Sequence, residues 1–308
     1  MFFKKIRSFI VRAYGFTKRR LEKPKRLWPK EKAAKATCEI YKRFTGCDLD
    51  IKNPVLFTEK VQWYKIYYHH DDMERIVDKY LFKGYIKERL GEGYTIPLYG
   101  GWTNLSDLEA DWASLPEEFC LKSNLQSQGN GIKIIHNKSE IDFKKLKKEL
   151  REWLKPKNTL IDSHCHAYHS ATPRILAEKY IPSLGEQLYD WKFFCFNGEP
   201  HCIYVSTSKF GDEFRHLSFY DTDWNMLPVK YGEHKSDYIE KPKHFDEMLK
   251  LSKQLSKGFP FIRVDFFESD EQFYIAEMTF YPGGGLTLYH PESFNREMGD
   301  KFILPKAE

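Results

Sequence analysis

Long apolar runs are missing from this chain of 308 residues. No stretch approaches the ~20 consecutive apolar residues that a membrane-spanning helix requires. The opening segment also lacks the uninterrupted apolar core of a secretory signal, because basic residues interrupt it. The six cysteines form no Cys-x-x-Cys pair and no evident disulfide framework. We therefore expect reduced thiols and a cytoplasmic location.

A strong excess of charge of one sign is also missing, since the net charge is only +5. This mild excess does not call for nucleic acid, and we expect none as a partner. The positive charge is concentrated in residues 1–35, which contain thirteen Lys or Arg against Glu22 and Glu31. Within residues 1–20, apolar residues recur at helical spacing, which is typical of an interfacial helix on an anionic membrane. An amphipathic helix that docks on the same protein fits this pattern as well.

A Walker A motif is absent too. A polar, glycine-containing loop at 123–131 lies between predicted strands at 119–122 and 132–135, but no Gly-Lys-Ser/Thr follows it. Such a loop can place backbone N–H groups over phosphates while Lys122, at its mouth, supplies a point charge. As a lone signal the loop is equally compatible with a simple hairpin turn.

The histidine-rich segment 163–169 does not have the spacing of a zinc site. A zinc site needs about four convergent ligands, and His164, Cys165 and His166 are too close together in the chain to supply them. We expect a mobile or substrate-facing loop there.

What the sequence does contain is a pair of apolar runs near the C-terminus. Residues 259–268 and 272–281 are rich in Phe, Ile, Val and Tyr, and a short polar turn separates them. This pattern predicts a β-hairpin. Alternation puts Arg263 and Asp265 on one face of the first strand, and Glu277 and Thr279 on one face of the second. A connecting loop with an odd number of residues would bring Asp265 opposite Glu277, whereas an even number would separate their faces.

Two adjacent carboxylates on a sheet repel each other unless a cation lies between them. Mg²⁺ is the natural candidate, because one or two carboxylates hold it while substrate phosphates complete its shell. The alternative is a pair of solvated carboxylates on an exposed face. The run Gly283-Gly-Gly285 favours the metal site, because a backbone free to adopt positive φ suits close approach to a ligand.

The remaining elements are predicted from periodicity and turn residues. Helices are expected at 32–44, from an N-cap at Thr58, at 71–90, at 142–154 and at 245–257, and an Asn-Gly turn at 197–198 predicts a second hairpin. Because helices precede a strand-rich body, we predict an α+β protein.

The order of these motifs resembles the ATP-grasp superfamily, and more closely its TupA-like branch (teichuronopeptide-biosynthesis-like proteins). The motifs that carry the resemblance are Asn53-Pro54, Thr58-Glu-Lys-Val-Gln-Trp63, Asp78-Lys-Tyr80, Phe119-Cys-Leu-Lys-Ser-Asn124, Ala177-Glu-Lys-Tyr-Ile181, Asp190-Trp-Lys-Phe-Phe-Cys-Phe-Asn-Gly198, Phe219-Tyr-Asp-Thr-Asp-Trp-Asn225, Phe261-Ile-Arg-Val-Asp265 and Glu277-Met-Thr-Phe-Tyr-Pro-Gly-Gly-Gly285. The resemblance implies an ATP-grasp fold in which two α+β subdomains clasp a nucleotide. It places a basic amphipathic segment at 1–35, a helical region at 36–93, a small subdomain with the phosphate loop at 94–177 and a large subdomain with the metal hairpin at 178–308.

The same resemblance implies roles for single residues. Lys79 and Lys122 would contact ATP phosphates under a loop that includes Ser123 and Gly129, and Lys192 or Arg215 would add a further phosphate contact. Glu178, Lys179, Tyr180 and Ile181 would read the adenine, and Asp190 would hold the ribose. Asp265, Glu277 and Thr279 would bind Mg²⁺. Arg263 would stabilise charge on the transferring group, together with Lys122.

The function implied is an ATP- and Mg²⁺-dependent carboxylate–amine ligase that works through an acyl phosphate. By analogy with the branch, the partners would be a uronic-acid-containing saccharide of the cell surface and an amino acid. Two alternatives stay open. One is a glycosyltransferase of the same pathway, for which Asp221-Thr-Asp223 would be the metal-binding pair. The other is a non-catalytic nucleotide-binding protein, because the 123–131 loop lacks the early His and Gly that the branch carries.

Overall fold

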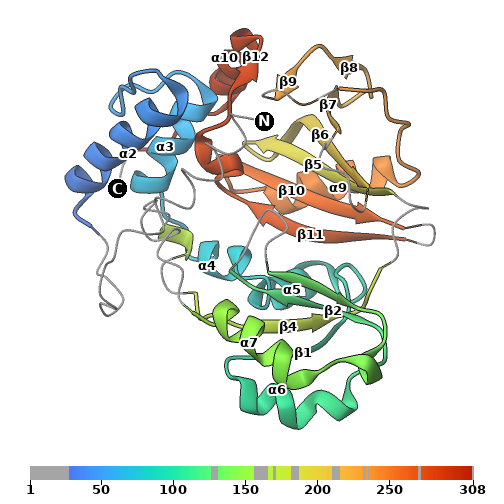
Figure 1. Cartoon of the computed structure of the whole chain (residues 1–308). Helices are drawn as coiled ribbons and strands as arrows, with labels where there is room; N and C mark the ends of the chain where they lie inside the picture. The colour runs from blue at the N-terminus through green and yellow to red at the C-terminus, as the bar shows by residue number, and fades with distance from the viewer. Residues whose placement is uncertain are drawn as a thin grey trace.

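The computed structural model describes residues 28–125, 131–155, 166–168, 171–181, 187–209, 216–231, 234, 236–269 and 272–306. Two antiparallel sheets dominate these residues, with helices between them and around them (Figure 1). The smaller sheet has the order β1-β4-β2-β3 and the larger has the order β11-β10-β5-β6-β7-β8. The strands of the two sheets are β1 (Leu98–Trp102), β2 (Phe119–Ser123), β3 (Ile132–Ile135) and β4 (Ile175–Glu178), then β5 (Gln187–Phe196), β6 (Glu199–Lys209), β7 (His216–Asp221), β8 (Met226–Leu227), β10 (Phe261–Glu268) and β11 (Phe273–Thr279).

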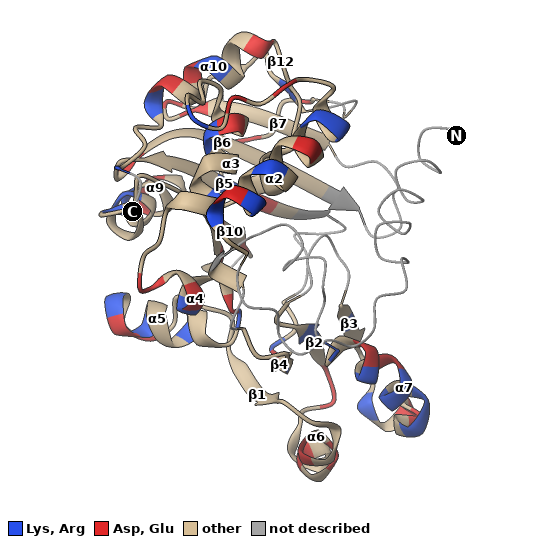
Figure 2. Ribbon diagram, turned by 90° about the vertical axis from the view of Figure 1, so that its left-hand side faces the viewer, with Lys and Arg blue, Asp and Glu red and all other residues tan. Residues whose placement is uncertain are grey.

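The smaller sheet packs its apolar face against two amphipathic helices. These are α6 (Leu105–Asp111) and α7 (Phe143–Trp153), and the second confirms the helix predicted at 142–154. Asp142 caps α7 by accepting a hydrogen bond from the backbone N–H of Lys145. Leu146 and Leu150 of α7 pack with Leu121 and Ile175 of the sheet, while basic residues cover the outer surface of the helix (Figure 2).

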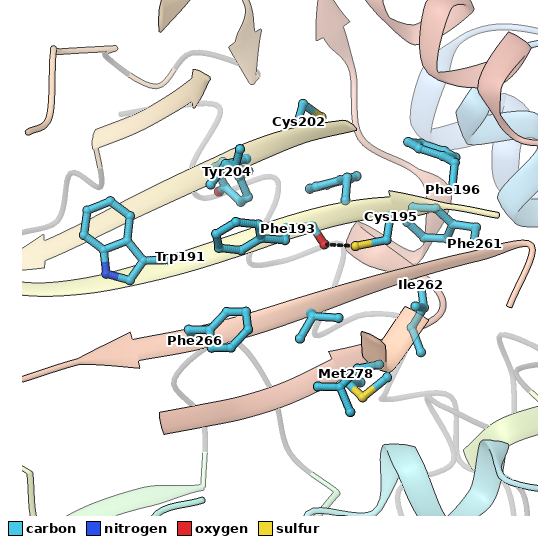
Figure 3. Packing of buried hydrophobic residues seen from close by; sticks show 14 of the residues in the cluster. Trp191, Phe193, Cys195, Phe196, Cys202, Tyr204, Phe261, Ile262, Phe266 and Met278 are labelled. Carbon is cyan, nitrogen blue, oxygen red and sulfur yellow. Dashed lines mark hydrogen bonds between the residues drawn. The ribbon is translucent and has the colours of Figure 1, made fainter. Parts of the chain in front are cut away.

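The larger sheet carries the main core. Trp191, Phe193, Phe266 and Met278 are fully buried on its strands (Figure 3), and α9 (Phe245–Ser256) covers this face. The predicted Asn-Gly turn between β5 and β6 is confirmed, with φ of 51° at Asn197 and 83° at Gly198. Burying aromatic rings at this density fixes the strands rigidly. On the opposite face, Phe194 and Phe261 pack with Phe57, and the same face of β5, β10 and β11 also carries polar groups.

The N-terminal helices pack against the C-terminal end of the chain. These elements are α2 (Lys30–Thr45), α3 (Phe57–Tyr67), α10 (Glu292–Lys301), the short turn η4 (Pro282–Gly285) and the two-stranded ribbon of β9 (Lys230–Tyr231) with β12 (Tyr289–His290). The prediction that Thr58 caps α3 is wrong, because the helix begins at Phe57 after Leu56. Instead, the buried Thr58 hydroxyl contacts Tyr41 and Asn295 at 3.0 Å each, which ties α2 and α10 to α3.

The single helix predicted at 71–90 is also wrong, because the structure has two helices there. They are α4 (Met73–Val77) and α5 (Leu81–Leu90). The buried Asp78 carboxylate accepts hydrogen bonds from the backbone N–H groups of Tyr80 and Leu81 at 2.8 and 3.4 Å. A side chain that takes up these N–H groups ends one helix and starts the next. Lys79 therefore lies at a sharp break between the two sheets, not on a continuous helix.

The predicted C-terminal hairpin is confirmed, but the number of residues in its loop does not explain how the strands pair. Glu268 pairs with Phe273, so four residues connect the strands, yet Asp265 lies directly opposite Glu277. A bulge between Asp265 and Phe266 shifts the register by one residue and restores this pairing. At the bulge, the backbone N–H of Ile275 donates to the carbonyl oxygen of Tyr94 at 2.7 Å. The prediction of facing carboxylates therefore holds because of a backbone irregularity.

Residues 1–27 lie outside the described residues, and with them the proposed interfacial helix. Among the residues that are described, no helix is long and apolar enough to cross a membrane.

Candidate active site

Charged side chains gather on the face of the larger sheet that looks away from α9. Cross-strand pairing puts Arg263 opposite Thr279, and it puts Asp265 between Glu277 on β11 and Lys192 on β5. Opposed residues of neighbouring strands share a face. β10 lies inside the sheet, and β11 is the edge strand beside α4 (Figure 1). The fold therefore brings five of the predicted site residues together on three adjacent strands, namely Arg263, Asp265, Glu277, Thr279 and Lys192.

Asp265 is the most tightly held carboxylate of this face and is only 2% exposed. The Arg263 guanidinium donates to both of its oxygens, from Nε to Oδ1 at 2.6 Å and from Nη2 to Oδ2 at 2.5 Å. The Lys192 ammonium lies 3.3 Å from Oδ2. Burial alone would raise the pKa of Asp265, but the charges of Arg263 and Lys192 lower it. The group is therefore an anion at neutral pH.

Glu277 is more open and less constrained. Its side chain is 31% exposed, and its Oε1 lies 3.9 Å from the Lys79 ammonium. The hydroxyl oxygen of Thr279, two residues further along β11, lies 3.4 Å from Nη2 of Arg263. Glu277 and Asp265 with the Thr279 hydroxyl offer oxygen donors on one face of the hairpin.

These oxygen ligands suit an Mg²⁺ ion that is shared with phosphate groups, rather than a metal ion held by protein ligands alone. No cluster of three or more His, Cys, Asp or Glu that could hold an ion occurs among the described residues. Mg²⁺ in nucleotide sites takes only one or two protein carboxylates and completes its octahedron with phosphate oxygens and water. Two facing carboxylates and a hydroxyl are compatible with that requirement.

A second charged cluster surrounds Glu178 at the end of β4. Lys122 on β2 and Lys83 on α5 reach its two oxygens at 2.6 and 2.7 Å. Burial alone would raise the pKa of Glu178, but the two ammonium groups lower it to about 2. Burial alone would lower the pKa of Lys122, whereas Glu178 and, more weakly, neighbours that include Glu277 raise it. Of the two lysines proposed for phosphate, Lys79 lies 3.9 Å from Glu277, and the negative charge of Glu277 also acts on Lys122.

Lys83 is a member of this cluster that the sequence reasoning missed. Its ammonium also donates to the carbonyl oxygen of Ile96 at 2.6 Å, so it ties α5 to the segment that precedes β1. The available signal was its position four residues after Lys79, on the helix that begins at Leu81.

We expect Glu178→Gln to lower the melting temperature at pH 7 and to change its pH dependence. The folded-state pKa of about 2 lies below the ordinary 4.5, so the charged pair contributes stability above pH ~4.5 that is lost as the pH falls toward ~2, by at most about 3 kcal/mol. The difference between wild type and variant, followed by thermal melting, should therefore shrink between about pH 5 and pH 3. A difference that is constant over this range would contradict the pairing.

The segment proposed to read adenine follows β4 directly. The backbone N–H of Lys179 donates to the carbonyl oxygen of Pro97 at 2.9 Å, and the Tyr180 ring lies edge-on to His136. Ile181, the last described residue before 187, is half-buried. Nothing in these contacts tests whether the segment binds adenine, which stays a prediction.

Asp190 lies beside Asp265 and pairs with Lys192. Burial raises the pKa of Asp190 despite that cation. Its Oδ1 is buried without a hydrogen-bond partner among the described residues. An acceptor oxygen in this state suits a hydroxyl of a bound ligand. This agrees with the ribose role but leaves it a prediction.

Of the two loop residues predicted to lie over the phosphates, Ser123 is among the described residues. Ser123 is buried, and its backbone N–H donates to the carbonyl oxygen of Gly131 at 2.8 Å. Its hydroxyl has no hydrogen-bond partner among the described residues. Gly129 lies outside the described residues, as do Arg215, His164 and Cys165.

The rival metal pair of a glycosyltransferase, Asp221 and Asp223, forms a turn. Oδ1 of Asp221 accepts hydrogen bonds from the backbone N–H groups of Asp223 and Asn225 at 2.9 and 2.8 Å, and Oδ2 accepts one from the Asn225 amide. Asp221 therefore stabilises the turn after β7.

Residues 59–303 match the model of one protein family, described as TupA-like ATPgrasp. The chain belongs to the TupA-like ATP-grasp family. The match spans α3, both sheets and α10, and therefore confirms the resemblance and the ATP-grasp fold class. ATP and Mg²⁺, the expected cofactors, are confirmed at the level of the family.

Solved structures similar to this TupA-like chain include several ligases. D-alanine–D-alanine ligase from Bacillus anthracis is 18% identical, with a TM-score of 0.41, 72% of this chain covered and 64% of that one. L-amino acid ligase from Bacillus licheniformis is 15% identical, with a TM-score of 0.39 and coverages of 69% and 42%. The biotin carboxylase domain of Hydrogenobacter thermophilus 2-oxoglutarate carboxylase, complexed with MgADP, is 14% identical, with a TM-score of 0.43 and coverages of 76% and 48%.

The chain spans less than two thirds of the length of each of these proteins. None of the curated proteins compared with the chain matches it.

Proposed function

We propose that this protein is an ATP- and Mg²⁺-dependent carboxylate–amine ligase. The observation that carries the proposal is that Asp265 and Glu277 face each other on the larger sheet. Arg263 binds Asp265 on the same strand, and Lys79, which lies between the sheets, is close to Glu277. Phosphoryl transfer depends on positioning and on neutralising phosphate charge more than on covalent chemistry of the protein. A metal-binding carboxylate pair surrounded by cations meets that need.

In the proposed reaction, a carboxylate oxygen of the acceptor attacks the γ-phosphorus of ATP, and the bond to ADP breaks. The nitrogen of an amine then attacks the acyl carbon, and the C–O bond breaks to release phosphate and leave an amide. Asp265, Glu277 and Thr279 would hold Mg²⁺, which would neutralise the charge of the phosphate oxygens.

The side chains of the chain itself divide the remaining work. Lys79 and Lys122 bind phosphate oxygens, and Arg263 stabilises negative charge as it develops on the transferring group and on the tetrahedral species. The positive charge of Lys192 stabilises the anionic form of Asp265. Lys192 also provides a further contact to phosphate. Glu178 orients Lys122 and lies at the start of the adenine segment.

The acceptor we propose is a uronic acid of a cell-surface polysaccharide or its precursor, and the amine is an amino acid. Membership of the TupA-like ATP-grasp family supports this choice, because the resemblance to that branch implies a teichuronopeptide type of product. A cytoplasmic location with peripheral contact at the inner face of the plasma membrane, through residues 1–20, agrees with such an acceptor.

Transfer of oxygen isotope tests the reaction class. With a uronic acid labelled with ¹⁸O in its carboxylate, an acyl-phosphate route moves one ¹⁸O into the released phosphate, which mass spectrometry detects. We expect labelled phosphate and an amide product, both dependent on the amino acid and on Mg²⁺. Unlabelled phosphate in the presence of product would contradict the acyl-phosphate route. Sugar transfer from a UDP-sugar without phosphate release would favour the glycosyltransferase.

A further inference from the structure

A buried hydrogen bond joins the two segments that carry the phosphate lysines. The Nδ2 amide of Asn124, directly after β2, donates to Oδ2 of Asp78 at 2.9 Å. Both residues are only 1% exposed, although 46 positions separate them in the chain. Asp78 immediately precedes Lys79, and Asn124 follows Lys122 by two residues.

Each partner of this bond is itself fixed to the backbone on its own side. Oδ1 of Asp78 takes up the Tyr80 N–H at the break between α4 and α5. Asn124 also donates from Nδ2 to the carbonyl oxygen of Thr172 at 2.8 Å and accepts from the Arg174 N–H at Oδ1 at 2.7 Å. The amide therefore cannot rotate without losing two further bonds, which defines its orientation.

The bond also has a direct consequence for geometry. Lys79 and Lys122 come from different parts of the fold, one from the break between two helices and one from a strand of the smaller sheet. Among the described residues, the hydrogen bond from Asn124 to Asp78 is a direct side-chain link between the two motifs that contain these lysines. Breaking a hydrogen bond in a buried site is costly, because it leaves polar groups without partners. The bond therefore keeps the two segments at one distance from each other.

We infer that Asp78 and Asn124 are positioning residues that set the distance between the two phosphate lysines. This inference rests on the proposed function, and it assigns a role that neither residue has in that proposal. Because each is only 1% exposed, neither side chain is placed to contact a bound nucleotide. They act by holding Lys79 and Lys122 at the spacing that a triphosphate requires, and errors of ~1 Å in such spacing cost up to about 100-fold in rate or affinity.

The test compares ATP with adenosine, which lacks the phosphates. Asn124→Asp keeps the shape and the Oδ1 acceptor but faces Asp78 with a second carboxylate. We expect it to weaken binding of a non-hydrolysable ATP analogue with Mg²⁺ by about 10-fold or more, while the affinity for adenosine, measured by competition, is unchanged. Asp78→Asn should weaken binding of the ATP analogue in the same way, because two amide donors then face each other. If Asn124→Asp does not fold, Asp78→Asn alone provides the test.

The double variant Asp78→Asn with Asn124→Asp reverses donor and acceptor of this bond and should recover part of the loss, because a carboxylate at position 124 still cannot donate to the carbonyl oxygen of Thr172. Asn104→Asp is the matched control. The Nδ2 group of Asn104 donates to Asp107 at 2.6 Å at the exposed start of α6, so this variant breaks the same type of bond away from the site. It should leave both affinities unchanged.

Equal weakening of ATP and adenosine, or no effect of either single variant, would overturn the inference. In those cases the wild type still binds Mg²⁺-ATP and the proposed function stands. If the wild type binds no ATP, the proposed function fails and takes the inference with it.

Discussion

Glu277→Gln is expected to abolish Mg²⁺-dependent turnover while the protein keeps its fold. Groups that only support metal ligands change metal affinity by about 10- to 100-fold, so losing a ligand should cost at least about 100-fold in Mg²⁺ affinity. Stability should change little, because the side chain is 31% exposed and its ion pair with Lys79 is long at 3.9 Å. Calorimetric titration with Mg²⁺ and an ATP analogue measures the first effect, and thermal melting measures the second.

Glu199→Gln provides the matched control for this prediction. Glu199 lies at the start of β6 on the same sheet, is exposed and pairs with Lys253 at 2.7 Å. Its neutralisation should alter neither Mg²⁺ affinity nor turnover. Full activity of Glu277→Gln at ordinary Mg²⁺ concentration would remove Glu277 from the metal site and return it to the class of solvated surface carboxylates.

Asp265→Asn is expected to lose both activity and stability. Its carboxylate is buried between Arg263 and Lys192. Neutralising it leaves the buried Arg263 guanidinium without its carboxylate partner, whereas Lys192 keeps its pair with Asp190. Removing one partner of a buried pair typically costs about 3–5 kcal/mol. We therefore expect a fall of this size in the free energy of unfolding, measured by denaturant titration.

The control for this variant is Asp246→Asn. Asp246 is exposed at the start of α9 and pairs with Lys241 at 3.1 Å, and its loss should change stability by less than about 1 kcal/mol. The contrast between Asp265 and Glu277 is the informative part. Both should abolish activity, but only Asp265→Asn should destabilise the fold. Equal stability of the two variants would contradict the buried pairing of Asp265.

Much of the hairpin could be predicted from local pattern, because strand alternation depends on neighbouring residues only. The register of Asp265 opposite Glu277 could not, since it depends on a bulge beside the Tyr94 carbonyl, a contact that is distant in sequence. The break at Asp78 was missed for a related reason. Its helical periodicity is intact, and only the carboxylate's bonds to the next two N–H groups show that the helix ends there.

The same limit explains which site residues were found. Lys79, Lys122, Glu178 and the hairpin residues sit in recognisable motifs, so resemblance located them. Lys83 lies in none of these motifs, and its pair with Glu178 depends on the fold. Asn124 lies in one of them, but its bond to Asp78 also depends on the fold. A sequence shows which residues can donate or accept, whereas the fold decides which ones meet.

The most direct measurement is calorimetric titration of the wild-type protein with a non-hydrolysable ATP analogue, with and without Mg²⁺, beside UDP-sugars as competitors. The account predicts binding of the ATP analogue that strengthens with Mg²⁺ and is not displaced by a UDP-sugar. No binding of the ATP analogue, or a preference for the UDP-sugar, would contradict the assignment of these charged residues to an ATP-dependent ligase.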